Sequence, residues 1–141
     1  LGTAKDGAFQ YADFPFLANC ARVPVIDGHL ESLTVEMERG GDEEEVARAM
    51  SQFRGEPQRL ELPTAPRAPI IVRKEDNRPQ PIQDVNAGEP QRARGMAVTV
   101  GRIRRKDQYL KLFVLSHNTI RGGAGGSVLN AELAYAKKLL R

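Results

Sequence analysis

Alternating apolar and polar residues predict a hairpin in the first quarter of the chain. Residues 17–26 and 29–38 each have the period of two that is typical of a half-buried strand. Asp27 and Gly28 lie between them, and an Asp-Gly pair favours a two-residue turn. Residues 1–15 have no such period, and we expect them to be irregular. The pattern therefore predicts an antiparallel pair of strands after an irregular lead-in.

A second pair of strands is predicted near the end of the chain, by residues 96–103 and 109–115. The charged segment Arg104–Asp107 would form the turn between them, and we interpret Arg104–Lys106 as solvated. These segments predict the main body of the sheet.

Two helices are predicted by a period near 3.6. Asp42 is placed to cap the first helix, Glu45 completes a capping-box pattern, and Gly55 would end it. The glycine-rich stretch 122–126 is predicted to be a loop that leads into the last helix. The apolar stripe of that helix would consist of Leu129, Leu133, Ala136 and Leu140.

Proline dominates the middle of the chain. Seven of the nine prolines lie between residues 57 and 90, so we expect residues 56–95 to be mostly extended loop, with a short buried strand at Ile70–Val72. A loop of this length in a compact domain is more often functional or an interface arm than idle. Strands followed by helices predict the α+β class, with a mixed, mostly antiparallel sheet covered by helices.

Composition narrows the class of protein. The chain has 141 residues, of which 40% are apolar and 28% charged, as in a soluble globular domain. A net charge of +3 does not indicate a nucleic-acid partner. No apolar stretch approaches the roughly 20 residues that span a bilayer, and we expect no signal peptide and no membrane partner. The single cysteine fits a reducing compartment, so we expect a cytoplasmic protein, with a plastid as the alternative.

Arg22 and His29 are the candidate functional residues on the predicted hairpin. An arginine can bind a carboxylate through two hydrogen bonds, and a histidine is suited to proton transfer near neutral pH. A two-residue turn would put Arg22, His29 and Glu31 on one face, with about 13 Å between the Cα atoms of Arg22 and His29. Pro24 cannot donate to the ladder, which leaves this register open. The residues alone leave a structural role for both side chains open as well.

Cys20 and the glycine-rich stretch 122–126 are weaker candidates for a functional role. We interpret Cys20 as a small buried apolar residue, because a cysteine in a strand usually is one and no neighbouring feature marks its thiol as reactive. Free N–H groups at the start of a helix can bind an anion, but the glycine-rich stretch is not a dinucleotide fingerprint. Close packing explains its glycines equally well. The sequence assigns no residue to a metal.

Several blocks of the sequence resemble, in the same order along the chain, those of the aspartate-semialdehyde dehydrogenases. The residues in these blocks are most similar to those of the archaeal and fungal branch of the family. The resemblance spans residues 22–132. The matching blocks are Arg22–Ser32, Leu62–Pro66, Arg78–Pro81, Gly95–Ile103 and Ser116–Glu132. The resemblance implies the C-terminal domain fold that these enzymes share with glyceraldehyde-3-phosphate dehydrogenases.

The resemblance also implies a chemistry. Such enzymes use NADPH to convert L-aspartyl-4-phosphate to L-aspartate 4-semialdehyde and phosphate, in lysine, threonine and methionine biosynthesis. A cysteine thiolate forms a thioacyl intermediate that accepts the hydride. His29 matches the acid/base histidine, and Arg22 matches the arginine that binds the α-carboxylate of the substrate. Asn118 matches a residue that contacts the nicotinamide end of NADP.

The chain does not contain two parts that the family pattern includes. The family's Rossmann domain and its Asn-Cys-Ser/Thr nucleophile segment lie upstream of residue 1, and Cys20 does not match that nucleophile. The resemblance predicts that residues 1–141 are the C-terminal part of a catalytic and dimerisation domain, inactive alone and homo-oligomeric as a dimer or tetramer. Two alternatives stay open, namely an acyl-thioester reductase of the malonyl-CoA reductase kind and a non-catalytic dimerisation module.

Overall fold

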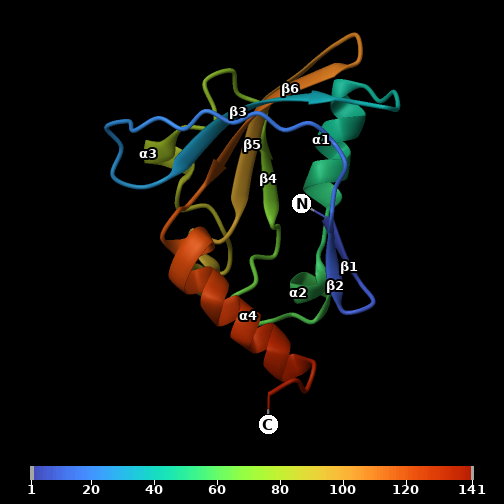
Figure 1. Cartoon of the computed structure of the whole chain (residues 1–141). Helices are drawn as coiled ribbons and strands as arrows, with labels where there is room; N and C mark the ends of the chain where they lie inside the picture. Colours follow the sequence, from blue (N-terminus) through green and yellow to red (C-terminus); the bar gives the residue numbers. More distant parts are fainter. Residues whose placement is uncertain (1, 141) are drawn as a thin grey trace.

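A mixed sheet of four strands forms the centre of the computed structural model, which describes residues 2–140 (Figure 1). The spatial order is β3-β6-β5-β4. β6 is antiparallel to both β3 and β5, and β4 is parallel to β5. The strands are β3 (His29–Glu36), β4 (Ile70–Arg73), β5 (Val98–Lys106) and β6 (Tyr109–Ser116). The predicted α+β class with a mostly antiparallel mixed sheet is confirmed.

Helix α1 (Glu43–Gln52) covers one face of the sheet. Its capping box forms as predicted: Asp42 Oδ1 accepts from the Glu45 N–H at 2.7 Å, and Glu45 Oε2 accepts from the Asp42 N–H at 3.1 Å. The helix packs its apolar side against the sheet through Val46 and Met50. The buried strand residues beneath them are Val100, Leu110 and Leu112.

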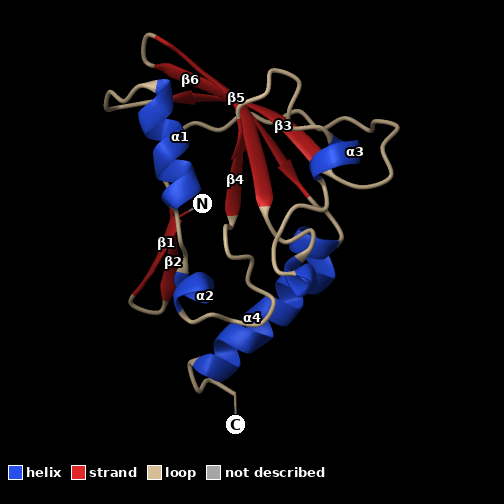
Figure 2. Cartoon of the chain, turned by 180° about the vertical axis from the view of Figure 1, so that it is seen from behind, coloured by secondary structure: helices blue, strands red, loops and turns tan. Residues whose placement is uncertain are grey.

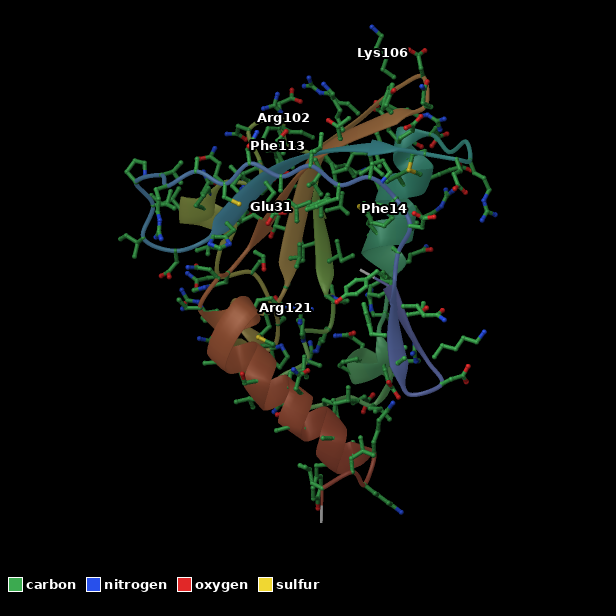
Figure 3. The ribbon with its side chains drawn as sticks, viewed as in Figure 1. Phe14, Glu31, Arg102, Lys106, Phe113 and Arg121 are labelled. Atoms are coloured by element: carbon green, nitrogen blue, oxygen red, sulfur yellow. The ribbon has the colours of Figure 1, made fainter. Side chains whose placement is uncertain are left out.

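The opposite face of the sheet carries Phe113 and Arg102. The guanidinium of Arg102 lies 5.2 Å from the centre of the Phe113 ring, a distance at which a cation and an aromatic face attract each other. Glu31 pairs with Val114 and therefore lies on the other side of the sheet from Phe113 (Figure 3). His29 shares its face with Glu31, because residues two apart in a strand point the same way.

Helix α4 (Gly125–Ala136) crosses below the ends of β4 and β5 (Figures 1 and 2). It follows the segment Ile120–Ala124, which is kinked at the non-helical Gly123, so of the predicted glycine loop only Gly125 and Gly126 belong to α4. A Cβ on Gly125 would collide with Met96 Sδ, which explains this glycine by close packing. Of the predicted stripe, Leu129 is buried and Leu133 partly buried, while Leu140 is exposed beyond the end of the helix.

A second apolar cluster holds α4 to the loops below the sheet. It combines Leu129 with Leu62, Ala65, Ala93 and Met96. The hydroxyl and the N–H of Thr64 both donate to Glu132 Oε2, at 2.7 and 3.0 Å. Within residues 2–140, no helix is long and apolar enough to cross a membrane.

The N-terminal predictions are wrong in two places. Residues 2–11 form a hairpin of β1 (Gly2–Lys5) and β2 (Ala8–Tyr11) rather than an irregular lead-in, and residue 1 lies outside the described residues. Residues 17–26 form a loop, not a strand. The Val25 N–H donates to the Val23 carbonyl at 2.8 Å, which closes a three-residue turn around Pro24. This turn and the missing N–H of proline interrupt the expected ladder, and β3 pairs with β6 instead.

The proline-rich middle is more ordered than predicted. The expected short strand is confirmed as β4, whereas three short helical turns replace parts of the expected loop. Prolines lie in the first turns of two of them, where the missing N–H has no intrahelical partner to lose. The turns are α2 (Glu56–Arg59), α3 (Pro81–Asp84) and η1 (Gln91–Ala93).

The basic segment Arg104–Lys106 belongs to β5, and only Asp107 and Gln108 form the turn to β6. Arg105 is half-buried rather than solvated. Its N–H donates to Glu43 Oε1 at 2.7 Å, and its guanidinium donates to the Gly41 carbonyl. The prediction of a turn at this segment is therefore wrong, and so is the solvated interpretation of Arg105, which joins the sheet to the start of α1; Arg104 and Lys106 are exposed as expected.

Candidate active site

His29 is the first residue of β3 and pairs with Ser116 at the end of β6. Its side chain is exposed, whereas Gly28 before it is buried. Gly28 has a φ of +106°, a conformation that residues with a Cβ rarely adopt. A Cβ there would also lie 3.1 Å from Leu115 Cδ1 and 3.2 Å from Val85 Cγ2. The backbone that leads into His29 therefore requires a glycine.

Asn118 lies two residues beyond the end of β6, the strand next to β3, and contacts this glycine from there. The Gly28 N–H donates to Asn118 Oδ1 at 2.8 Å, although the two residues are 90 positions apart in sequence. The backbone N–H is a donor, so the oxygen of the amide must face it. Within residues 2–140 the Nδ2 group of Asn118 has no hydrogen-bond partner, which leaves a half-buried donor beside His29.

Thr119 makes a second link to the same turn. Its hydroxyl lies 3.4 Å from Asp27 Oδ1 and 3.3 Å from His117 Nδ1. His117 Nδ1 already accepts the Ile120 N–H at 3.4 Å, so the Thr119 proton is available for Asp27. His117 itself is only 5% exposed. Sequence reasoning missed Thr119 as a contact of the turn; its place in the loop after a predicted strand, beside Asn118, was the signal that could have found it.

A buried carboxylate supports the turn from the α3 side. Asp84 is 2% exposed and accepts hydrogen bonds from Arg78 Nε at 2.7 Å, Arg73 Nε at 3.2 Å and the Gln80 N–H at 2.8 Å. Burial raises the pKa of Asp84, but the bonds and charges of these partners outweigh it, so the pKa lies below its ordinary value. Pro81 and Val85, on either side of Asp84, approach Gly28.

Arg22 lies in the exposed loop before the turn. The predicted pairing of residues 17–26 with residues 29–38 is wrong, since the neighbour of β3 is β6. The expected separation of about 13 Å between the Cα atoms of Arg22 and His29 depended on that hairpin and is no longer supported. His29 and Glu31 do share a face as predicted. Cys20 is exposed, contrary to its interpretation as a buried apolar residue, because the loop packs no strand around it.

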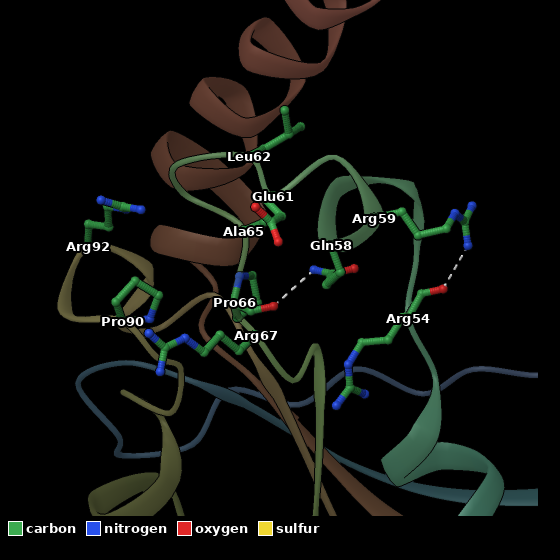
Figure 4. A pocket seen from close by; sticks show the side chains of 10 residues that line it. All are labelled: Arg54, Gln58, Arg59, Glu61, Leu62, Ala65, Pro66, Arg67, Pro90 and Arg92. Atoms are coloured by element: carbon green, nitrogen blue, oxygen red, sulfur yellow. Dashed lines mark hydrogen bonds between the residues drawn. The ribbon is translucent and has the colours of Figure 1, made fainter.

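A cavity of about 590 Å³ lies away from His29 between α2 and the loops around Pro66 and Pro90 (Figure 4). Four arginines line it, and three of them donate to backbone carbonyls. The pairs are Arg54 with Ser51 and Phe53, Arg59 with Arg54, and Arg92 with Pro63. These guanidinium groups brace the loops. A smaller hollow of about 390 Å³, between residues 24–27 and α3, adjoins the turn before His29.

Comparison with known families gives one match over most of the chain. Residues 1–121 match the family described as semialdehyde dehydrogenase, dimerisation domain. This range includes Arg22, His29 and Asn118.

Three known proteins are similar to the chain. An aspartate-semialdehyde dehydrogenase of Methanothermobacter thermautotrophicus is 46% identical over 94% of this chain and 38% of its own length. A malonyl CoA reductase (NADP) of Metallosphaera sedula is 46% identical over 85% of this chain and 33% of its own length. The crystal structure of aspartate semialdehyde dehydrogenase with NADP from Candida albicans superposes with a TM-score of 0.69, at 36% identity, over 84% of this chain and 32% of that one. The chain thus spans less than two fifths of the length of each of these proteins.

Proposed function

Since the chain belongs to the semialdehyde dehydrogenase dimerisation-domain family, we propose that it is the C-terminal part of an aspartate-semialdehyde dehydrogenase. The complete protein would reduce L-aspartyl-4-phosphate to L-aspartate 4-semialdehyde and phosphate with NADPH. The observation that carries this proposal is the 46% identity to an archaeal aspartate-semialdehyde dehydrogenase over 94% of the chain. The cytoplasmic location expected from the sequence stays a prediction.

Within this reaction His29 is the acid/base group and Arg22 binds the α-carboxylate of the substrate. The His29 side chain is exposed at the end of β3, on a backbone that the Gly28 contacts hold in place, so it can reach a bound molecule. A titratable ring suits the transfer of a proton to and from a thiol and a leaving group. Arg22 is exposed on a loop, where its planar fork of donors is free to bind a carboxylate.

Asn118 is suited to contact the nicotinamide end of NADP, which supplies the hydride when it is bound. The Oδ1 atom of Asn118 is occupied by the Gly28 N–H, so the residue can only donate to a further group, through Nδ2. A half-buried amide donor next to His29 fits the oxygen of a carboxamide. The rest of the cofactor would be held by parts of the protein outside this chain.

The nucleophile of the reaction is also proposed to lie outside this chain. Cys20 is exposed on a loop two residues before Arg22, and it does not match the Asn-Cys-Ser/Thr segment of the family. We therefore expect residues 1–141 alone to be inactive. The complete protein is proposed to combine this part with a dinucleotide-binding domain and to form a homo-oligomer, a dimer or a tetramer.

The exposed apolar side chains of residues 9–26 support assembly with another copy. They include Phe9, Tyr11, Phe14, Phe16 and Leu17. Large apolar groups gathered in one exposed segment are typical of an interface. Membership of a dimerisation-domain family favours a second copy as the partner.

A second candidate function is the reduction of an acyl thioester such as malonyl-CoA. It is favoured by the 46% identity to the malonyl CoA reductase of Metallosphaera sedula over 85% of this chain. The same His29 and Arg22 could serve that reaction, because malonyl-CoA also presents a carbonyl centre and a carboxylate. A non-catalytic dimerisation module is the third possibility.

A substrate assay of the complete protein distinguishes these functions. We expect aspartyl phosphate to cause oxidation of NADPH with stoichiometric release of phosphate, and malonyl-CoA to cause none. Turnover with malonyl-CoA alone would establish the acyl-thioester reductase instead. A folded complete protein that turns over neither substrate would refute both enzymatic functions and leave the dimerisation module.

Replacing Arg22 by lysine in the complete protein should raise the KM for aspartyl phosphate about 10-fold or more. Lysine keeps the charge but loses the two-pronged hydrogen bond to a carboxylate, and hydrogen bonds to charged groups contribute about 1.5–3 kcal/mol. Steady-state kinetics measures the effect. Arg39→Lys, at another exposed loop arginine, is the matched control and should leave this KM unchanged. A changed KM for NADPH with an unchanged KM for aspartyl phosphate would contradict the role of Arg22.

A further inference from the structure

We propose that Asn118 and Thr119 are positioning residues for His29. Together they bind the turn Asp27-Gly28 from the end of the neighbouring strand β6 and fix the direction in which β3 begins. This inference rests on the proposed function, in which His29 is the acid/base group. It assigns to Asn118 a task besides its contact with the cofactor, and it gives Thr119 a role in the reaction.

The backbone before His29 lies outside the sheet, so strand pairing does not fix its conformation. The β3–β6 ladder begins at His29, and residues 12–28 belong to no strand. Gly28 lacks a Cβ and has more backbone freedom than any other residue type. The bond from the Gly28 N–H to Asn118 Oδ1 is the side-chain contact that removes this freedom.

Burial of Gly28 makes the loss of this hydrogen bond unfavourable. Gly28 is buried beneath Leu115, Val85 and Pro81, so its N–H cannot exchange Asn118 for water without movement of the turn. A buried donor left without a partner is unfavourable, and the chain relieves it by shifting. Since His29 is the next residue, a shift of Gly28 is passed directly to the catalytic ring.

Thr119 acts on the neighbouring residue and more weakly. Its hydroxyl is 3.4 Å from Asp27 Oδ1, longer than an ordinary hydrogen bond between oxygens, and both groups are nearer to solvent. We therefore expect the loss of the Thr119 hydroxyl to have a smaller effect than the loss of the Asn118 side chain. If replacements of Asn118 and of Thr119 both lower kcat, the loop 117–120 acts as one positioning element.

The amide of Asn118 allows its two tasks to be separated. Asn118→Asp keeps an oxygen for the Gly28 N–H but removes the Nδ2 donor, whereas Asn118→Ala removes both. Because a displacement of about 1 Å can lower a rate about 100-fold, positioning predicts that Asn118→Ala lowers kcat by about 10- to 100-fold. Asn118→Asp should recover most of this kcat while the KM for NADPH rises.

Thr119 has a matched control elsewhere in the fold. Thr119→Val should lower kcat several-fold with little change in either KM, and Thr119→Ser should restore it. Thr64→Val removes a shorter hydroxyl bond, 2.7 Å to Glu132, between residues 68 positions apart and far from His29. It should leave kcat unchanged, because the position of His29 does not depend on that bond.

The experiment is steady-state kinetics of the complete protein, with amide hydrogen exchange at Gly28 on the same samples. Protection of the Gly28 amide should persist in Asn118→Asp and be lost in Asn118→Ala. Equal kcat values for Asn118→Ala and wild type, or equal losses in Ala and Asp, would overturn the proposal. An inactive wild-type protein would refute the proposed function instead, and the exchange of Gly28 would still decide whether Asn118 holds the turn.

Discussion

Replacing His29 by alanine in the complete protein is expected to lower kcat about 1,000-fold. General acid/base catalysis by a positioned side chain contributes about 100- to 10,000-fold, and alanine removes it entirely. The KM values for NADPH and aspartyl phosphate should change little, because the proposed role of His29 is proton transfer and not the binding of either molecule. Single-turnover kinetics with saturating NADPH would isolate the chemical step from product release.

The control for this experiment is Cys20→Ser. Cys20 lies on the same exposed loop that leads to the turn, and it is not the proposed nucleophile. The variant should keep the wild-type kcat. Loss of turnover in Cys20→Ser would mean that the nucleophile lies in this chain after all, and a His29→Ala protein that keeps its kcat within a few-fold would remove His29 from the mechanism.

Asp84→Asn is expected to destabilise the fold by about 3 kcal/mol. Removing one partner of a buried charge pair costs about 3–5 kcal/mol, because the remaining charge is left without compensation. The side chain of Asp84 is fully buried, while those of Arg73 and Arg78 are 33% and 16% exposed. Because water can partly solvate the two arginines, we expect a loss of stability at the lower end of this range. Urea unfolding measures the loss as a lower midpoint at an unchanged slope.

The Asp84 carboxylate also determines how the free energy of unfolding changes with pH. The pKa of Asp84 is lower in the folded protein, so its contribution is complete above the ordinary aspartate pKa. That contribution is lost as the pH falls from there through the lower pKa of the folded state. The difference in free energy of unfolding between wild type and Asp84→Asn should therefore be constant near neutral pH and shrink on acidification.

Glu75→Gln is the matched control for Asp84. The Glu75 carboxylate is 4.0 Å from Arg78 and half exposed, and exposed ion pairs contribute little to stability. We expect Glu75→Gln to unfold at nearly the wild-type urea concentration. An equal loss of stability in the two variants would show that the Asp84 network is no more important than a surface pair.

Local signals were sufficient to predict much of the sheet and the first helix. β5 and β6 follow from their apolar runs, and α1 follows from Asp42 and Glu45, whose capping bonds depend only on neighbouring residues. The hairpin at Asp27-Gly28 was mispredicted because the partner of a strand is a long-range choice. The turn pattern was present, but β6 supplied a continuous apolar strand that the segment around Pro24 could not match.

The connections around the candidate site could not be predicted from the sequence. Arg22, His29 and Asn118 were identified by resemblance, whereas the bond from Gly28 to Asn118 depends on a sheet that joins residues 90 positions apart. The Asp84 network was missed because its partners lie in a segment where prolines obscure any period. A buried aspartate cannot be distinguished from a solvated one until the arginines around it are placed.

The pairing of β3 with β6 also sets the order in which this domain can be completed during synthesis. β3 emerges from the ribosome long before Tyr109–Ser116, its neighbour in the sheet. Until then its backbone groups have no strand to pair with, and closing so long a loop makes the step slow. The segment that carries His29 therefore reaches its final place late, after α1 and the β4 segment have left the exit tunnel. A nascent chain cut before Asn118 would contain the histidine without the contact that orients it.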